Sequence, residues 1–127
     1  MQVWELLCPG RPEEVSRARR WTRDVLAGCP QADDAALIVT ELGTNAVTHT
    51  SSPDFRVSIR RARSTVTITV SDHGNSATVP LPTTPNAEGT HGRGLFLVTQ
   101  LAARVRITNH MYGHTVAAHL APEAPAC

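Results

Sequence analysis

Lysine is absent from this sequence of 127 residues, and all twelve basic side chains are arginines. A chain of ordinary composition and this length would carry roughly 7 lysines, and a GC-rich genome that favours arginine codons explains the bias. The absence still has chemical consequences. Walker A phosphate loops, kinases with a strand lysine, Schiff-base enzymes and serine–lysine hydrolases all need the missing amine. A nucleotide bound by this chain must therefore be held in another way.

Long apolar runs, paired cysteines and a strong net charge are also missing. No apolar run approaches the roughly 18 residues of a membrane span, and the first residues lack the pattern of a signal peptide. Cys8, Cys29 and Cys127 form no CxxC pair and no HExxH pair is present, so neither a disulfide framework nor a zinc site is indicated. A net charge of +1 argues against direct nucleic-acid binding. We expect one cytoplasmic domain over residues 1–127, without membrane or nucleic-acid contacts.

The hydrophobic period changes along the chain from helical to extended and back. In chain order, we expect a strand at 3–7, helices at about 12–26 and 31–50, a hairpin of strands at about 56–60 and 65–71, a helix at 92–103, and strands at 104–108 and 115–120. Residues 73–91 are rich in Pro, Thr, Ser, Asn and Gly, which is typical of a functional lid. This order predicts an α+β two-layer sandwich, with helices on one face of a mainly antiparallel mixed sheet.

One stripe of the second expected helix combines three polar side chains. Glu41, Asn45 and His49 are four residues apart and therefore share a helix face. This stripe borders the apolar one that packs into the core. A carboxylate can act as a general base, and an amide oxygen is a hard ligand suited to Mg²⁺. The stripe is therefore a candidate site rather than only a solvated face.

Two more candidate groups follow. Alternation through the second hairpin strand gives Asp72 the inward phase, and His73 and Gly74 then break the strand, which places this carboxylate at the mouth of a cavity. Gly92 and Gly94 open the third helix, where free backbone N–H groups and the helix dipole favour an anion. Arg93 between them adds a positive side chain. Together these residues offer a way to hold phosphates without lysine.

In this order, the three groups resemble the motifs of the GHKL, or Bergerat-fold, ATPases. This superfamily comprises histidine-kinase catalytic domains, gyrase B subunits and heat-shock chaperones. Residues 41–49 resemble its N box, residues 72–74 its G1 box and residues 92–95 its G2 box. Within the superfamily, the sequence is most similar to the anti-sigma-factor serine kinases and stand-alone ATP-binding regulators of actinobacteria. The resemblance covers nearly the whole chain.

The resemblance implies a role for each N-box residue. Glu41 would act as the general base towards the phosphate acceptor. Asn45 would coordinate the Mg²⁺ ion that bridges the phosphates of ATP. His49 belongs to the motif and is assigned to the architecture of the site only.

The glycine-rich boxes would hold the rest of the nucleotide, by the same resemblance. Asp72 would accept a hydrogen bond from the adenine amino group, and Gly74 would let the base approach the backbone. Gly92 and Gly94 would present N–H groups to the phosphates beneath the lid at 73–91, with Arg93 as an additional phosphate contact.

The sequence departs from the family pattern at two positions. Ser76 stands where the G1 box usually has its second glycine. In the last strand, many relatives have a threonine directly after the turn glycine, where this chain has His114. His114 is in phase with the apolar residues of that strand, whereas Thr115 points to the other side.

The resemblance implies an ATP- and Mg²⁺-dependent protein-serine kinase. Such a protein binds a sigma factor, phosphorylates a serine of an anti-anti-sigma protein with a STAS-type domain, and forms a homodimer. The alternative is a non-catalytic module whose partner affinity is set by ATP, and Ser76 and a lid without arginine or lysine favour it. An isolated histidine autokinase is disfavoured because no long helical hairpin carries a phosphoacceptor histidine. The arginines at 56, 60, 61 and 63 could contact DNA or an acidic partner, but solvated arginines on a strand are the simpler interpretation.

Overall fold

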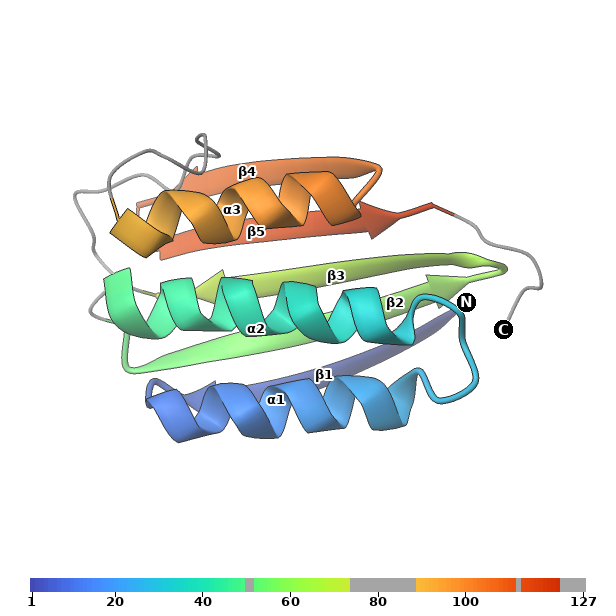
Figure 1. The fold of residues 1–127 in the computed structure, drawn as a ribbon. Helices are drawn as coiled ribbons and strands as arrows, with labels where there is room; N and C mark the ends of the chain where they lie inside the picture. Colours follow the sequence, from blue (N-terminus) through green and yellow to red (C-terminus); the bar gives the residue numbers. More distant parts are fainter. Residues whose placement is uncertain (50–51, 74–88, 112, 122–127) are drawn as a thin grey trace.

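In the computed structural model, three helices cover one face of a five-stranded sheet (Figure 1). The structure describes residues 1–49, 52–73, 89–111 and 113–121. The helices are α1 (Pro12–Val25), α2 (Ala32–His49) and α3 (Gly89–Leu101), and the strands are β1 (Gln2–Pro9), β2 (Asp54–Ala62), β3 (Thr65–Asp72), β4 (Arg104–His110) and β5 (Gly113–Leu120). The predicted α+β two-layer sandwich is confirmed.

The sheet has the strand order β1-β2-β3-β5-β4. All four pairings between these described strands are antiparallel, where a mainly antiparallel sheet was expected. The pairing of β3 with β5 brings together two segments that are far apart in the sequence, and β4 then forms the edge next to β5. The central strands therefore carry residues from both halves of the chain.

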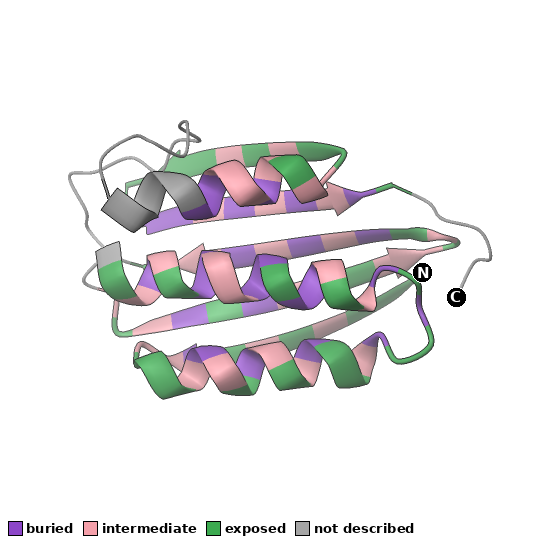
Figure 2. Ribbon diagram, viewed as in Figure 1, coloured by how far each residue is buried: buried purple, intermediate pink, exposed green. Residues whose placement is uncertain are grey.

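The core lies between the two layers, and the expected apolar stripes face it. Val15 and Ala18 of α1 and Ile38 and Leu42 of α2 are buried, as is Val98 of α3. Strand alternation supplies the other half of the core, from Phe55, Val57, Ile59, Val66, Ile68, Val70, Val116, Ala118 and Leu120. Figure 2 shows this alternation as purple bands along β2, β3 and β5 beneath the helices. None of the described helices is long and apolar enough to cross a membrane.

Helix α3 differs from the expected one at both ends. It begins at Gly89 rather than Gly92, so part of the expected lid is helical. It ends at Leu101, and the N–H of Ala103 donates to the carbonyl of His119 on β5 (2.8 Å), which directs the chain into β4. The other residues of the expected lid, 74–88, lie outside the part of the chain that the structure describes.

Four segment ends meet at one end of the molecule. The C-terminal ends of α2 and β3 lie there with the N-terminal ends of α3 and β5 (Figure 1). These segments carry the candidate residues of all three motifs, so the topology brings the motifs to a common region. At the opposite end, the buried Gln31 donates from Nε2 to the carbonyls of Ser64 (2.7 Å) and Ala121 (3.2 Å) and ties the hairpin turn to the end of β5.

Candidate functional site

Helix α2 presents Glu41 and Asn45 to α3 across a very short distance. A Cβ atom added to Gly94 would lie 2.8 Å from Oε2 of Glu41 and 3.7 Å from Oδ1 of Asn45. Gly94 itself is buried, so no side chain other than hydrogen fits there without displacing the carboxylate. The predicted N box and G2 box are thus in direct contact, and the i, i+4 spacing of Glu41 and Asn45 places both on the flank of α2 that faces α3.

The side chain of Asn45 is incompletely satisfied. Its Nδ2 atom is buried and has no hydrogen-bond partner within the described part of the chain. Buried amide groups in native structures are nearly always paired, so an orphaned one needs an explanation. A polar ligand between α2 and α3 would supply the missing partner. This atom, together with the glycine that leaves room beside Glu41, fits a site built for a bound molecule.

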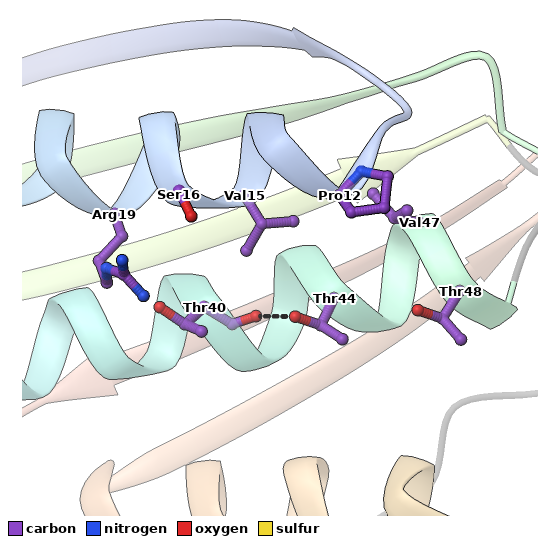
Figure 3. A pocket seen from close by; sticks show the side chains of 8 residues that line it. All are labelled: Pro12, Val15, Ser16, Arg19, Thr40, Thr44, Val47 and Thr48. Atoms are coloured by element: carbon purple, nitrogen blue, oxygen red, sulfur yellow. Dashed lines mark hydrogen bonds between the residues drawn. The ribbon is translucent and has the colours of Figure 1, made fainter.

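The opposite flank of α2 faces α1 and has a different character. There, Thr40 and Thr44 lie over a groove of about 230 Å³ between the two helices (Figure 3). The hydroxyl of Thr44 donates to the carbonyl of Thr40 (2.7 Å), so it is used within the helix. None of the predicted site residues that the structure describes lines this groove. It is formed by Pro12, Val15, Ser16, Arg19, Thr40, Thr44, Val47 and Thr48. The two flanks of α2 are therefore chemically distinct.

Asp72 ends β3 on the inner face of the sheet, as its phase predicts. It lies opposite His114 on β5, and Nδ1 of His114 is 3.2 Å from Oδ1 of Asp72. Both side chains are well buried, with exposed fractions of 9% for Asp72 and 7% for His114. Burying a carboxylate requires donors, and the imidazole supplies one.

The backbone around this pair is tightly packed. A Cβ on Gly113 would lie 2.0 Å from the carbonyl oxygen of Asp72, so only glycine fits directly before His114. On the other side, the N–H of His73 donates to Oγ of Ser52 (2.9 Å), and its Nδ1 lies 3.0 Å from Oδ1 of Asp54. These contacts fix where β3 ends and where the chain leaves towards residue 74.

The remaining predicted residues are only partly placed. Gly74 lies outside the described residues, and of Gly92 and Arg93 the structure gives the backbone within α3. Because α3 begins at Gly89, the first four N–H groups without an intrahelical acceptor are those of residues 89–92. Gly92 falls within this turn, and Gly94 lies two residues beyond it. The side chain of His49 is not described either.

A protein-only metal site is not present in the parts that the structure describes. No group of three or more His, Cys, Asp or Glu side chains there is placed to hold a metal ion. Mg²⁺ is commonly bound through one or two protein ligands together with substrate phosphates. The single amide oxygen of Asn45 beside Gly94 fits this pattern.

Sequence reasoning missed the contact between His114 and Asp72. The alternation of apolar and polar residues placed both side chains on the inner face of the sheet, and this was the only sequence signal for the contact. It could not show that β3 and β5 are neighbours, because that pairing joins segments more than 40 residues apart. The contact between Gly94 and Glu41 is likewise a product of helix packing and not of local pattern.

The sequence and the fold are both similar to those of known proteins. A model of the histidine kinase-like ATPase domain matches residues 8–119. A search of curated proteins gave no match. Among solved structures, the chain is similar to the RsbU and RsbW domains of Rv1364c from Mycobacterium tuberculosis, with 18% identity, a TM-score of 0.70, and coverage of 99% of this chain and 34% of that one.

A second similar structure is the histidine kinase domain of the blue-light activated histidine kinase EL346 from Erythrobacter litoralis. It is 20% identical, with a TM-score of 0.54 and coverage of 88% of this chain and 60% of that one. At such identities the two likenesses show the fold, and the chain corresponds to only part of each structure. The family model spans most of the sequence, so this protein belongs to the histidine kinase-like ATPase family, as the GHKL resemblance predicted.

Proposed function

We propose that this protein is an ATP- and Mg²⁺-dependent regulator of the anti-sigma-factor kinase type. It would act in the cytoplasm, bind a sigma factor, phosphorylate a serine of a STAS-type anti-anti-sigma protein, and form a homodimer. The observation that carries the proposal is the contact of Gly94 with Glu41 and Asn45, because it joins two motifs of the resembling kinases in one place. The likeness to a structure containing an RsbW domain supports the same fold.

Each side chain then has a chemical task. Asn45 would give its Oδ1 atom to Mg²⁺, and its unpaired Nδ2 would donate to a phosphate oxygen. Glu41, beside Gly94, would orient and deprotonate the attacking serine hydroxyl. Bound Mg²⁺ would neutralise the charge that develops on the phosphates. N–H groups of the first turn of α3, including that of Gly92, would bind the phosphate oxygens, and Arg93 would add its charge.

Adenine would be recognised at the C-terminal end of β3. Asp72 would accept a hydrogen bond from the amino group of the base, and Gly74 would allow the base to lie against the backbone. The burial of Asp72 supports this assignment, because a carboxylate with little exposure discriminates strongly between donors and acceptors.

Nucleotide binding is tested by thermal unfolding with Mg·ATP. At 100 times the dissociation constant, a ligand that binds only the folded state adds about 2.7 kcal/mol of stability. We expect this shift for the wild type and its loss in Asn45→Ala. Thr44→Ala is the matched control, since Thr44 lies one position away on the opposite flank of α2 and should leave the shift unchanged. A wild type that shows no shift would overturn the proposal.

Phosphoryl transfer is tested separately with labelled ATP and a STAS-type partner. Glu41→Gln should abolish transfer and keep the thermal shift with Mg·ATP, because the amide occupies the same volume but cannot accept the proton. The non-catalytic alternative gives a different result: the wild type binds ATP and the partner, ATP changes the affinity for the partner, and no label is transferred.

A further inference from the structure

We propose that the outer face of the sheet is a docking surface for an acidic α-helical segment of a partner protein. This face lies opposite the three helices, and none of the described helices covers it (Figure 1). The candidate site is on the other side of the sheet. The inference therefore goes beyond the proposed function and does not depend on nucleotide binding.

Four arginines occupy outward positions on this face. Arg56 and Arg60 lie on β2, Arg104 and Arg106 lie on β4, and all four side chains are exposed. None of them forms an ion pair with a side chain in the described part of the chain. Positive charges without a local partner attract carboxylates from another molecule. A second copy of this chain would instead bring two positive surfaces together.

Carboxylates on the same face do not neutralise the arginines. The outward positions of the described strands carry two of them, Glu5 on the edge strand β1 and Asp54 at the start of β2. Oδ1 of Asp54 already lies 3.0 Å from Nδ1 of the histidine that follows β3. The charge of the face also reaches its centre: the pKa of His119 is lowered first by burial and then by Arg104 and Arg106.

The arginines stand on both sides of a low floor. Between them, β3 and β5 present short side chains, those of Thr67, Thr69, Ser71, Thr115 and Ala117. Arg60 on β2 and Arg104 on β4 belong to one row and are separated by three strand spacings, which is about 14 Å. An α-helix with its side chains is about 10–12 Å wide. A helix that lies along the strands therefore fits on the floor, with an acidic flank towards each pair of arginines.

One end of the floor is hollow. Thr67, His119 and Arg104 contribute to the lining of a space of about 510 Å³ there. A carboxylate of the docked helix that enters this space would lie beside the guanidinium of Arg104. The hollow thus gives the surface a place for one acidic side chain in addition to its general attraction for negative charge.

A protein fits this face better than a nucleic acid. Val3 and Leu7 on β1 lie in the rows of Arg60 and Arg56, and their exposed fractions are 49% and 52%. Arginines beside exposed apolar side chains are typical of protein interfaces, whereas phosphates gain nothing from the apolar groups. The net charge of +1 for the whole chain is also far from the strongly basic balance of nucleic-acid-binding domains.

The experiment uses a labelled, cross-linked alanine helix with glutamates on two opposite flanks, and the same helix with glutamines in their place. Fluorescence anisotropy measures the binding of each peptide to the wild type at low and high salt. We expect the glutamate peptide to bind at least about tenfold more tightly than the glutamine peptide. This preference should shrink as salt screens the charges.

Three variants locate the binding surface. Arg60→Ser with Arg104→Ser should weaken binding of the glutamate peptide at least about tenfold. Ala117→Glu keeps all four arginines but fills the centre of the floor, and it should weaken binding as strongly. Arg19→Ser with Arg20→Ser removes the same charge from α1 and is the matched control, which should leave the affinity within about twofold of the wild type.

Each other outcome overturns the proposal. The surface is not an acidic docking site if the glutamate peptide fails to bind up to about 1 mM, if the glutamine peptide binds equally well, or if the α1 variant loses as much affinity. A wild-type dimer in sedimentation that Ala117→Glu converts to a monomer would assign the face to a second copy. A short DNA duplex that binds this face more tightly than the peptide would assign it to nucleic acid. Absence of the Mg·ATP thermal shift would overturn the proposed function alone.

Discussion

Three glycines of this chain meet different surroundings, and those surroundings set what each position tolerates. A Cβ on Gly113 would meet backbone atoms of Asp72, whereas a Cβ on Gly94 would meet the far end of the Glu41 side chain. A Cβ on Gly43 would lie 3.5 Å from side-chain carbons of Val15 and Phe55. At Gly113 the neighbouring backbone cannot move without separating two strands. At Gly94 the Glu41 carboxylate can move aside, and at Gly43 a distance of 3.5 Å is an ordinary van der Waals contact. The same substitution should therefore have three different effects.

Gly113→Ala should destabilise the fold strongly. The added methyl would overlap the carbonyl oxygen of Asp72 at 2.0 Å, so β5 must move away from β3 where the two strands begin their pairing. Forced overpacking of this kind costs typically 1–3 kcal/mol and more where backbone has to shift, so we expect a loss of about 2–4 kcal/mol. Denaturant unfolding measures it. A loss below about 0.5 kcal/mol would contradict the close approach of the two strands.

Gly94→Ala should instead reduce binding at little cost in stability. Alanine is favoured over glycine in a helix by about 1 kcal/mol, which offsets the displacement of the Glu41 carboxylate. The unfolding free energy should stay within about 1 kcal/mol of the wild type. The methyl nevertheless enters the space beside Oε2 of Glu41 and Oδ1 of Asn45. We expect Mg·ATP affinity to fall at least about tenfold by calorimetry; unchanged affinity would show that this space is not used by the nucleotide.

At the scale of the elements, α2 connects the core to the site. One stripe of the helix buries Ile38 and Leu42 against the sheet, the flank with Glu41 and Asn45 faces α3, and the flank with Thr40 faces α1. The helical period alone separates these three surfaces. The position of Glu41 and Asn45 is therefore held by the packing of the whole helix.

Gly43→Ala should stabilise α2 without touching the site. Gly43 lies inside the helix on the side towards α1 and the sheet, and the added methyl would contact Val15 and Phe55 at ordinary van der Waals distance. Replacing a glycine in a helix interior by alanine contributes about 0.5–1 kcal/mol when the space is available. Thermal unfolding should show this gain, with Mg·ATP affinity unchanged. The variant also serves as the control for Gly94→Ala, and a loss of stability would mean that the contacts are tighter than 3.5 Å.

The elements could be predicted from the sequence where the signal is local. The periods of α1, α2, β2 and β3 follow directly from their apolar residues, and the core confirms them. The start of α3 was misplaced because the residues from Gly89 to Gly92 have no apolar period, and glycine favours no helix. The pairing of β3 with β5, and with it the contact of Asp72 with His114, could not be derived, since it depends on how distant segments fold together.

At the scale of the whole molecule, the two faces of the sheet differ. The inner face is covered by the three helices, whereas none of the described helices covers the outer one (Figure 1). The outward residues of β3 are threonines and a serine, and exposed arginines lie on β2 and β4. The register places Arg60, Thr67, His119 and Arg104 in one row across four strands. His119 in this row lies near the positive charges of Arg104 and Arg106, so the binding of a proton by His119 is linked to the unfolding of the molecule.

The free energy of unfolding should fall as the pH is lowered through 6.5, in part because of His119. Its pKa is lowered from the ordinary value of 6.5, first by burial and then by the nearby charges of Arg104 and Arg106. Below pH 6.5 the unfolded chain therefore binds this proton more readily than the folded one, and protons favour unfolding. His119→Asn, which can keep a hydrogen bond to Thr67, should flatten this part of the pH dependence.

The causes can be separated by removing one charge. Arg104→Ser eliminates the larger of the two repulsive interactions but leaves the burial of His119 in place, so the slope of unfolding free energy against pH should decrease only in part. Denaturant unfolding at several pH values between 5 and 7.5, in 0.15 M salt, compares the wild type, His119→Asn and Arg104→Ser. Arg19→Ser on α1, away from this face, is the control and should keep the wild-type slope. If His119→Asn keeps the full wild-type slope, then His119 does not carry the effect. In that case the acid sensitivity of the fold must come from groups elsewhere in the molecule.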